Sequence, residues 1–197
     1  MQDPTKLGQR ARKFVEEYRQ VQLLLSIPTA MPRSSHTWNP PPRRSFKLNF
    51  DTVVFNDIKA SGIGAIIQND LGEVMVSISA RDPQVGDGEE AETLVCRRAL
   101  ELAVDSGFSD LIIEGDNASV MKNIAGSCPR FSRFDHLYQD IHCLVSSLHS
   151  TLITCVHREA NGVAHSLARY ARNIDDDIIW MEDTPPSALE ALYLDSS

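Results

Sequence analysis

Three stretches between residues 46 and 80 combine apolar and β-branched residues, with polar turn residues between them. Short stretches of this composition predict β-strands rather than helices. The tetrapeptide Asn69-Asp70-Leu71-Gly72 is typical of a tight turn, which makes the strands on either side of it run antiparallel. The predicted strands cover 46–55, 62–68 and 73–80. This part of the chain is therefore expected to form a three-stranded antiparallel meander.

After residue 88 the apolar residues recur every three to four positions, as they do in helices. Apolar residues at this spacing predict an amphipathic helix over 89–106, and Gly107 is a typical residue for ending it. The same criteria predict helices over 117–124, 134–148 and 161–171 and strands over 111–113 and 151–157. Three antiparallel strands followed by alternating helices and strands predict an α/β fold with a five-stranded mixed sheet flanked by helices.

The segments on either side of this domain have other patterns. Residues 7–25 place apolar residues at helical spacing beside a basic face, and the prolines between Pro28 and Arg44 exclude a regular element. The last residues are acidic and interrupted by prolines, which is typical of a tail. The predicted organisation is a basic N-terminal helix and Pro-rich linker over 1–45, the α/β domain over 46–173 and an acidic C-terminal tail over 174–197.

Charge is divided unevenly between the N-terminal quarter and the rest of the chain. Residues 1–50 hold nine Lys and Arg against three Asp and Glu, a net charge of +6, although the whole chain carries −8. The remaining residues are therefore strongly acidic, and an acidic surface attracts phosphates poorly. Such a domain suits a protein whose carboxylates hold metal ions, or one that does not bind nucleic acid.

The cysteines and the short apolar stretches indicate an intracellular protein. Cys96, Cys128, Cys143 and Cys155 form no CxxC pair, so they are interpreted as reduced residues rather than as disulfides or a zinc site. The apolar stretch at 21–28 is too short to cross a membrane and too weakly apolar for a signal peptide. We expect a monomeric nuclear or cytoplasmic protein with no membrane contact and no small-molecule cofactor.

Three acidic residues lie where the predicted elements would bring them together. Asp51 lies inside an apolar strand, Glu92 in the first turn of the long helix, and Asp116 just after the strand at 111–113. A carboxylate in an apolar strand is costly to bury unless it is paired or metal-bound. Each acid has a simpler interpretation alone, because Glu92 could favour the helix dipole and Asp116 could cap a helix. Together they predict an all-oxygen site for Mg²⁺ or Mn²⁺.

Four stretches of the chain resemble the plant ribonuclease H-like domains found in non-LTR retrotransposon polyproteins and in genes derived from them. The resemblance covers about residues 38–185, and its specificity lies in the joint order of motifs that are individually short. The stretches are KLNFDTVVFND (47–57), GIGAIIQNDLGEVMVS (62–77), EEAETLVCRRALELAVDSGFSDLIIEGDNASVMKNI (89–124) and VHREANGVAHSLARYA (156–171). The resemblance implies a ribonuclease H-like fold and a partner that is an RNA–DNA hybrid or another nucleic acid.

The same resemblance implies a catalytic set formed by Asp51, Glu92, Asp116 and the residue at position 165. The three acids would hold two Mg²⁺ or Mn²⁺ ions for hydrolysis of an RNA phosphodiester, with Asp51 bridging both ions. The fourth acid of type 1 ribonucleases H lies in a motif resembling N-x-x-A-D-x-L-A, where this chain reads NGVAHSLA over 161–168. His165 therefore replaces an aspartate, and a neutral nitrogen ligand suits Mg²⁺ poorly.

Three functions fit these features. The three carboxylates favour a metal-dependent endonuclease for the RNA strand of RNA–DNA hybrids, whereas His165 and the acidic surface favour a catalytically impaired, domesticated module for nucleic-acid or protein binding. A 3′–5′ exonuclease is a third hypothesis, since it shares the same sheet and carboxylate chemistry. Two further residues carry open alternatives. His157 is either a proton shuttle or an ordinary strand-end histidine, and Arg158 is either a phosphate contact or a solvated charge.

Overall fold

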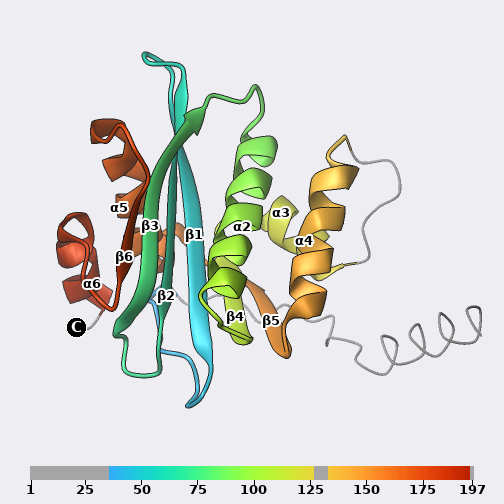
Figure 1. Ribbon diagram of the computed structural model, residues 1–197, viewed down its shortest axis with the longest axis vertical. Helices are drawn as coiled ribbons and strands as arrows, with labels where there is room; N and C mark the ends of the chain where they lie inside the picture. Colours follow the sequence, from blue (N-terminus) through green and yellow to red (C-terminus); the bar gives the residue numbers. More distant parts are fainter. Residues whose placement is uncertain (1–35, 127–132, 196–197) are drawn as a thin grey trace, which may run out of the picture. The chain divides into compact units, whose positions relative to one another are not determined.

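The computed structural model describes residues 36–126 and 133–195. The helix predicted over 7–25, most of the Pro-rich linker and Cys128 lie outside these residues. Within the described part, the helices and strands that precede residue 174 lie close to their predicted positions (Figure 1). No helix of this part is both long enough and apolar enough to cross a membrane.

A mixed sheet forms the centre of the domain (Figure 1). β1 (Phe46–Phe55), β2 (Ala60–Gln68) and β3 (Val74–Pro83) form the predicted antiparallel meander. β4 (Asp110–Gly115) pairs with β1 in parallel, and β5 (Ser150–Cys155) pairs with β4 in the same direction. β4 therefore ends beside the middle of β1, close to Asp51.

The sheet has one strand more than the five that the sequence predicted. β6 (Ile178–Met181) pairs antiparallel with the outer edge of β3, and it comes from the segment predicted as an acidic tail. Four apolar residues directly after Asp175-Asp176-Asp177 carry too short a pattern to indicate a strand by themselves. The strand exists because β3 offers it an unpaired edge. The α/β class is confirmed, and the strand count was wrong by one.

Helices cover both faces of the sheet (Figure 1). One face is covered by α2 (Gly88–Asp105) and α3 (Ala118–Ala125), and α4 (Asp135–Ser147) packs against α2. The opposite face is covered by α5 (Gly162–Tyr170), with α6 (Leu189–Asp195) packed beside it. The two layers of helices leave the middle of β1, at Asp51, and the end of β4, at Gly115, as the place where side chains from both faces can meet.

The two faces of β1 differ in chemistry. Leu48 and Phe50 pack into the larger hydrophobic core with Leu100 of α2 and Ile113 of β4. Successive side chains of a strand point to opposite faces, so the residues between them face α5. These intervening residues are polar and equally buried, namely Lys47, Asn49 and Asp51. Burial of three consecutive polar positions on one strand face requires a partner for each of them.

Two glycines of β2 let α5 lie close against the sheet. A Cβ on Gly64 would sit 2.1 Å from the carbonyl oxygen of Ala164, and one on Gly62 would sit 2.0 Å from that of Ala168. No side chain can be accommodated at these distances, so the helix backbone rests directly on the strand. Gly64 is also the register partner of Asp51 across the β1–β2 ladder. The close approach therefore brings α5 to the strand position that carries Asp51.

Candidate active site

Asp51 lies in the middle of β1 and is 3% exposed. Its Oδ1 accepts a hydrogen bond of 2.8 Å from the backbone N–H of Thr52, and its Oδ2 lies 2.6 Å from Nδ1 of His165. Each carboxylate oxygen has two lone-pair directions, so both oxygens retain capacity for another ligand. A backbone contact on one side and an imidazole on the other hold the carboxylate in a fixed orientation.

Glu92 is the one member of an acidic helix start that turns toward the sheet. The first turn of α2 contains Glu89 and Glu90. The N-cap residue is Asp87, whose side chain accepts a hydrogen bond from the backbone N–H of Glu89. Oε1 of Glu89 accepts a hydrogen bond of 2.9 Å from the Tyr138 hydroxyl. Glu92 is 8% exposed, and its Oε2 is buried without a hydrogen-bond partner among the described residues. A buried oxygen of this kind calls for a ligand.

Asp116 follows directly after β4 and is only partly buried. The alternative in which it caps the following helix does not hold, because Asn117 is the N-cap of α3 and accepts from the backbone N–H groups of Ser119 and Val120. The carboxylate of Asp116 is therefore not used for capping. Since β1 and β4 are adjacent and parallel, Asp116 comes to the same end of the sheet as Asp51.

These three carboxylates form one cluster. One oxygen from each of Asp51, Glu92 and Asp116 lies within 4.8 Å of the other two. Burial, together with the negative charges of Asp51 and Asp116, raises the pKa of Glu92 to about 9. Burial and the charge of Asp51 also raise the pKa of Asp116, although Arg158 and His165 oppose the change. Three negative charges in this cluster are therefore unfavourable unless a cation joins them.

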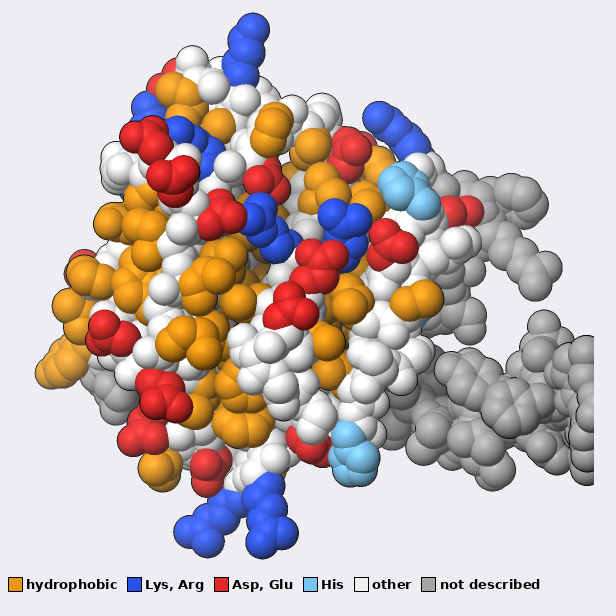
Figure 2. Space-filling view, in the orientation of Figure 1, with side chains coloured by type: hydrophobic (Ala, Val, Ile, Leu, Met, Phe, Trp, Pro, Cys, Tyr) orange, Lys and Arg blue, Asp and Glu red, His pale blue; other side chains and the backbone are white. Residues whose placement is uncertain are grey.

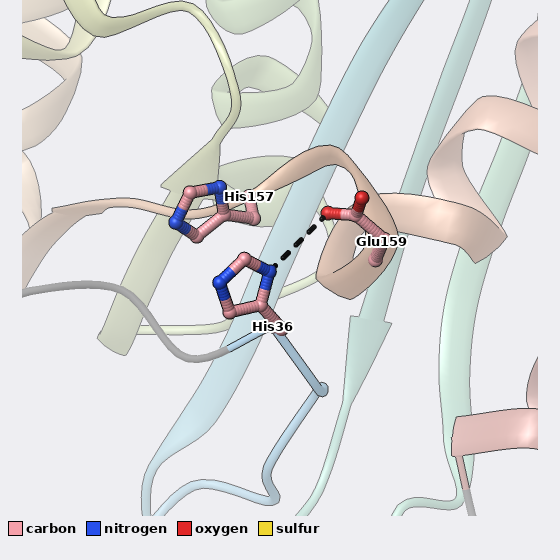
Figure 3. Close-up of side chains that lie close together, drawn as sticks. All are labelled: His36, His157 and Glu159. Atoms are coloured by element: carbon pink, nitrogen blue, oxygen red, sulfur yellow. Dashed lines mark ion pairs between the residues drawn. The ribbon is translucent and has the colours of Figure 1, made fainter.

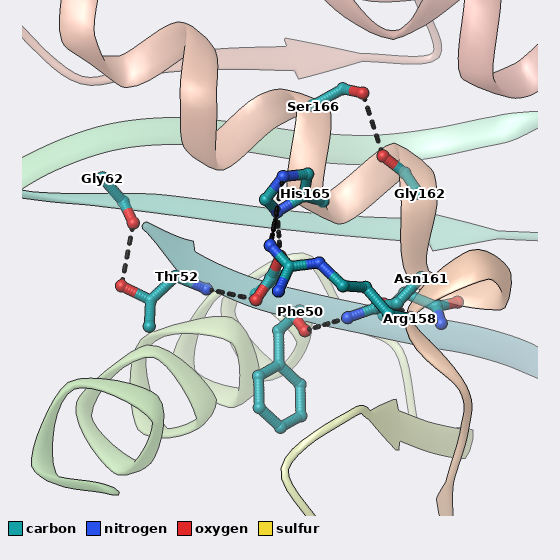
Figure 4. A network of polar contacts seen from close by, with 10 residues as sticks. Phe50, Thr52, Gly62, Arg158, Asn161, Gly162, His165 and Ser166 are labelled. Carbon is teal, nitrogen blue, oxygen red and sulfur yellow. Dashed lines mark hydrogen bonds and ion pairs between the residues drawn. The ribbon is translucent and has the colours of Figure 1, made fainter. Parts of the chain in front are cut away.

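His165 lies in α5 and contacts the cluster directly. Its Nδ1 is at hydrogen-bond distance from Asp51, and Nη2 of Arg158 lies 3.4 Å from both ring nitrogens (Figure 4). The sequence indicated a weakened metal ligand at this position, and it did not indicate the bond to Asp51. Arg158, for which phosphate contact and solvation were both open, directs its guanidinium to this histidine.

A divalent cation fits the cluster on two observations. The donors are all oxygen, which suits Mg²⁺ and Mn²⁺ better than softer metals. A cation beside the three carboxylates would offset their repulsion and so lower the raised pKa of Glu92. The same cation would give the buried Oε2 of Glu92 a partner. Asp51, Glu92 and Asp116 are the residues that would hold it.

A buried polar network next to the cluster was missed by the sequence analysis. Asn49 of β1 accepts a hydrogen bond of 3.2 Å from the Trp38 indole, and its amide lies 3.1 Å from Oε2 of Glu114 and 3.3 Å from Oδ1 of Asn161. Asn161 in turn donates to the carbonyl of Phe50 at 2.8 Å, which ties the turn before α5 to the strand of Asp51. The run of polar residues on β1 was the available signal.

Similarity to known proteins agrees with this fold. A family model described as reverse transcriptase-like matches residues 49–171, more than half of the chain. The chain belongs to the reverse transcriptase-like family. The match and the fold confirm the predicted ribonuclease H-like domain. No curated protein matches the sequence of the chain.

The solved structures that resemble this reverse transcriptase-like domain include ribonucleases H. RNase H1 from the archaeon Halobacterium salinarum has a TM-score of 0.59 at 23% identity, and the match covers 66% of this chain and 98% of that one. The N-terminal RNase H domain of a Mycobacterium tuberculosis protein has a TM-score of 0.58 at 20% identity, covering 66% and 94%. LC11-RNase H1 in complex with an RNA/DNA hybrid has a TM-score of 0.57 at 16% identity, covering 66% and 97%. Likeness at these identities establishes the fold.

Proposed function

We propose that this chain is a divalent-metal-dependent ribonuclease that hydrolyses the RNA strand of an RNA–DNA hybrid. The proposal rests on the convergence of Asp51, Glu92 and Asp116 from three separate elements, with their oxygens within 4.8 Å of one another. A buried, unbonded oxygen of Glu92 and its raised pKa support a cation at this position. Mg²⁺ or Mn²⁺ is the cation that suits such a donor set.

The residues of the cluster have separable tasks. Asp51, Glu92 and Asp116 would hold the cation, whose chemistry is to polarise the phosphate and lower the pKa of water. Thr52 and His165 hold the two oxygens of Asp51 in place, so the carboxylate is oriented before substrate arrives. Glu92 is protonated at neutral pH while its pKa stays near 9, so cation binding must release a proton from it.

His165 is the residue that limits this site. An aspartate there would add negative charge and an oxygen ligand, whereas the imidazole adds neither and already contacts Asp51. Mn²⁺ accepts nitrogen ligands more readily than Mg²⁺ does. We therefore expect weak cleavage in Mg²⁺ and better cleavage in Mn²⁺.

The proposed substrate is supported by the related fold and by the charges around the site. LC11-RNase H1, of similar fold, has been solved in complex with an RNA/DNA hybrid. Arg158 is exposed beside His165, where a guanidinium can contact a phosphate oxygen. On the face that Figure 2 shows, basic side chains are interspersed with acidic ones instead of forming one broad patch. Because the chain carries a net charge of −8, binding should depend on the cation site more than on general attraction of phosphates.

A second candidate is a module that binds a partner without cleaving it. The observation in its favour is that nitrogen groups already lie beside Asp51: Nδ1 of His165 is 2.6 Å from its Oδ2, and the Arg158 guanidinium contacts that histidine. Such groups would offset part of the charge that a cation otherwise neutralises. The module and the nuclease differ in one measurable property, which is cleavage of the RNA strand.

The test compares three proteins on one RNA–DNA hybrid with a labelled RNA strand at matched Mg²⁺ or Mn²⁺ concentration. Asp116→Asn is expected to lower cleavage by about 100-fold or more, because it removes a direct ligand. His165→Asp is expected to raise Mg²⁺-dependent cleavage by about tenfold, because it restores an oxygen ligand. Thermal melts of all three proteins control for folding.

Two outcomes would contradict the proposal. If neither the wild type nor His165→Asp cuts the hybrid in either metal, the binding module is the better description. If Asp116→Asn cuts as well as the wild type, the cleavage does not arise from this cluster.

A further inference from the structure

A second cluster of metal-binding side chains lies outside the carboxylate site. It consists of His36, His157 and Glu159, and one ligand atom from each lies within 4.8 Å of the other two. The imidazole rings of His36 and His157 are stacked, with centroids 4.0 Å apart and planes 11° from parallel (Figure 3). Nδ1 of His36 lies 3.8 Å from Oε2 of Glu159. This histidine–glutamate cluster contains two nitrogen donors and one carboxylate.

The cluster joins two segments that are far apart in sequence. His36 lies two residues before Trp38, whereas His157 and Glu159 belong to the turn that includes η1 (Arg158–Asn161). The exposed fractions are 75% for the His36 side chain and 69% for that of Glu159. An ion from solution can therefore reach the side chains of His36 and Glu159.

Buried neighbours hold both segments in place. Trp38 is 8% exposed and Asn161 is 1% exposed, and both hydrogen-bond to the side chain of Asn49. One buried residue therefore anchors the backbone of both segments and keeps the ligand-bearing residues near each other. An ordered backbone reduces the conformational entropy lost when an ion binds.

The separation is close to what a metal requires. Two ligands of a tetrahedral Zn²⁺ at bond lengths near 2.0–2.1 Å are about 3.4 Å apart. Ligand atoms within 4.8 Å therefore need movements of about 1–1.5 Å, which exposed rings can make by rotating about their side-chain bonds.

We propose that His36, His157 and Glu159 form a site for a borderline transition-metal ion, with Zn²⁺ as the ion that best suits it. Two imidazoles and one carboxylate are a donor set that Zn²⁺ accepts, with the fourth position left to water. Mg²⁺ prefers oxygen ligands and does not compete well for nitrogen. The two clusters of this chain therefore select different classes of cation.

Zinc here would brace the turn that carries Arg158. Arg158 lies between the two ligands His157 and Glu159 in sequence, and its guanidinium reaches His165. Binding to the native state alone raises stability by mass action. Zn²⁺ should therefore raise the melting temperature of the wild type, whether or not the carboxylate cluster cleaves RNA.

The test is calorimetric titration of Zn²⁺ alone into the full chain, in buffer that contains excess Mg²⁺. His36→Ala and His157→Ala should each weaken the tightest zinc binding by about tenfold or more and remove the melting-temperature increase. His149→Ala is the matched control, because His149 is also exposed and pairs with a carboxylate, Asp110, at 2.8 Å elsewhere on the surface. It should bind zinc as the wild type does. Asp51→Asn should also retain the zinc site.

The inference is overturned if His36→Ala and His157→Ala bind Zn²⁺ with wild-type affinity and stoichiometry. It is also overturned if Asp51→Asn abolishes the binding and the histidine variants do not, since the zinc would then occupy the carboxylate cluster. Both histidines are exposed, so the variants should fold; metal-free melts check this, and His36→Gln and His157→Gln serve as second variants.

Discussion

Two buried glutamates in neighbouring parts of the molecule have opposite electrostatic environments. Glu114 of β4 is 6% exposed and Glu92 of α2 is 8% exposed. Oε1 of Glu114 lies 2.9 Å from Nζ of Lys47, and its Oε2 accepts a hydrogen bond from Asn49. Glu92 instead lies beside the carboxylates of Asp51 and Asp116, with an oxygen that has no hydrogen-bond partner among the described residues.

The difference shows that burial alone does not identify a functional acid. The Lys47 ammonium also donates to the carbonyl of Asn39 at 2.6 Å and lies 5.3 Å from the centre of the Trp38 ring, so the ion pair of Glu114 is supported on every side. A buried charge that is fully paired is complete within the protein. Glu92, in contrast, has a carboxylate oxygen with no partner among the described residues, and a cation from solution would supply one. Two experiments test this difference: removal of the Lys47 charge beside Glu114, and addition of a divalent cation beside Glu92.

The largest effect is expected at the paired site. Lys47→Met keeps the length of the side chain but leaves Glu114 buried without its counter-charge. Removing one partner of a buried pair is expected to lower the free energy of unfolding by about 3–5 kcal/mol. Urea unfolding measures this, with Lys122→Met as the control, because Lys122 is exposed on α3. A loss below about 1 kcal/mol for Lys47→Met would mean that Asn49 alone satisfies Glu114.

A smaller effect is expected when a divalent cation is added to the cluster of Asp51, Glu92 and Asp116. Millimolar Mg²⁺ or Mn²⁺ should raise the melting temperature of the wild type, with a gain of about 2.7 kcal/mol at one hundred times the Kd. Asp51→Asn should lose most of this increase, because it removes a ligand of the cluster. Asp105→Asn, at an exposed position of the same helix as Glu92, should keep it. Equal increases in the wild type and Asp51→Asn would exclude a cation at Asp51.

Over a single pH unit, the smallest effect is the pH dependence of the metal-free protein. The pKa of Glu92 is about 9 in the folded state and near 4.5 when the chain is unfolded, so the folded state holds a proton that the unfolded state releases. The stabilisation from this proton is complete below pH 4.5 and is lost as the pH rises through about 9. One group contributes a slope of at most about 1.4 kcal/mol per pH unit.

Glu92→Gln should remove this contribution, because the amide does not titrate. Unfolding free energies measured from pH 5 to 9 in the presence of a chelator provide the comparison. The raised pKa of Asp116 gives a contribution of the same sign, so a reduced slope should remain in the variant. Identical slopes in the variant and the wild type would show that Glu92 is charged without a cation.

The elements that the sequence predicted are those whose signal is local. The apolar stripe of α2 and the turn between β2 and β3 depend on residues close to one another in the chain, and both lie where they were expected. β6 has no comparable signal, because its four residues become a strand only through the free edge of β3. Local patterns report on local structure, and an edge strand depends on its neighbour.

The candidate site was predictable to the extent that its residues are unusual where they stand. Asp51 is an acid inside an apolar strand, and this alone marked it. Glu89, Glu90 and Glu92 are three glutamates in the same helix turn, and the sequence does not distinguish them. The packing of α2 brings Glu92 to the cluster, whereas Glu89 accepts a hydrogen bond from Tyr138. His165 was identified as a substituted ligand, but its bond to Asp51 depends on how closely α5 lies against β2 at Gly64.

The sequence alone predicts the α/β class, the meander and the three acids expected to bind a cation. These follow from hydrophobic period, turn residues and the cost of burying charge, which are properties of short segments. Only the tertiary structure decided which buried acid is paired and which is not. Lys47 reaches Glu114 across 67 positions of sequence, and His36 reaches Glu159 across 123. Electrostatic pairing depends on distance in space, so it is settled only when the sheet and its helices have packed.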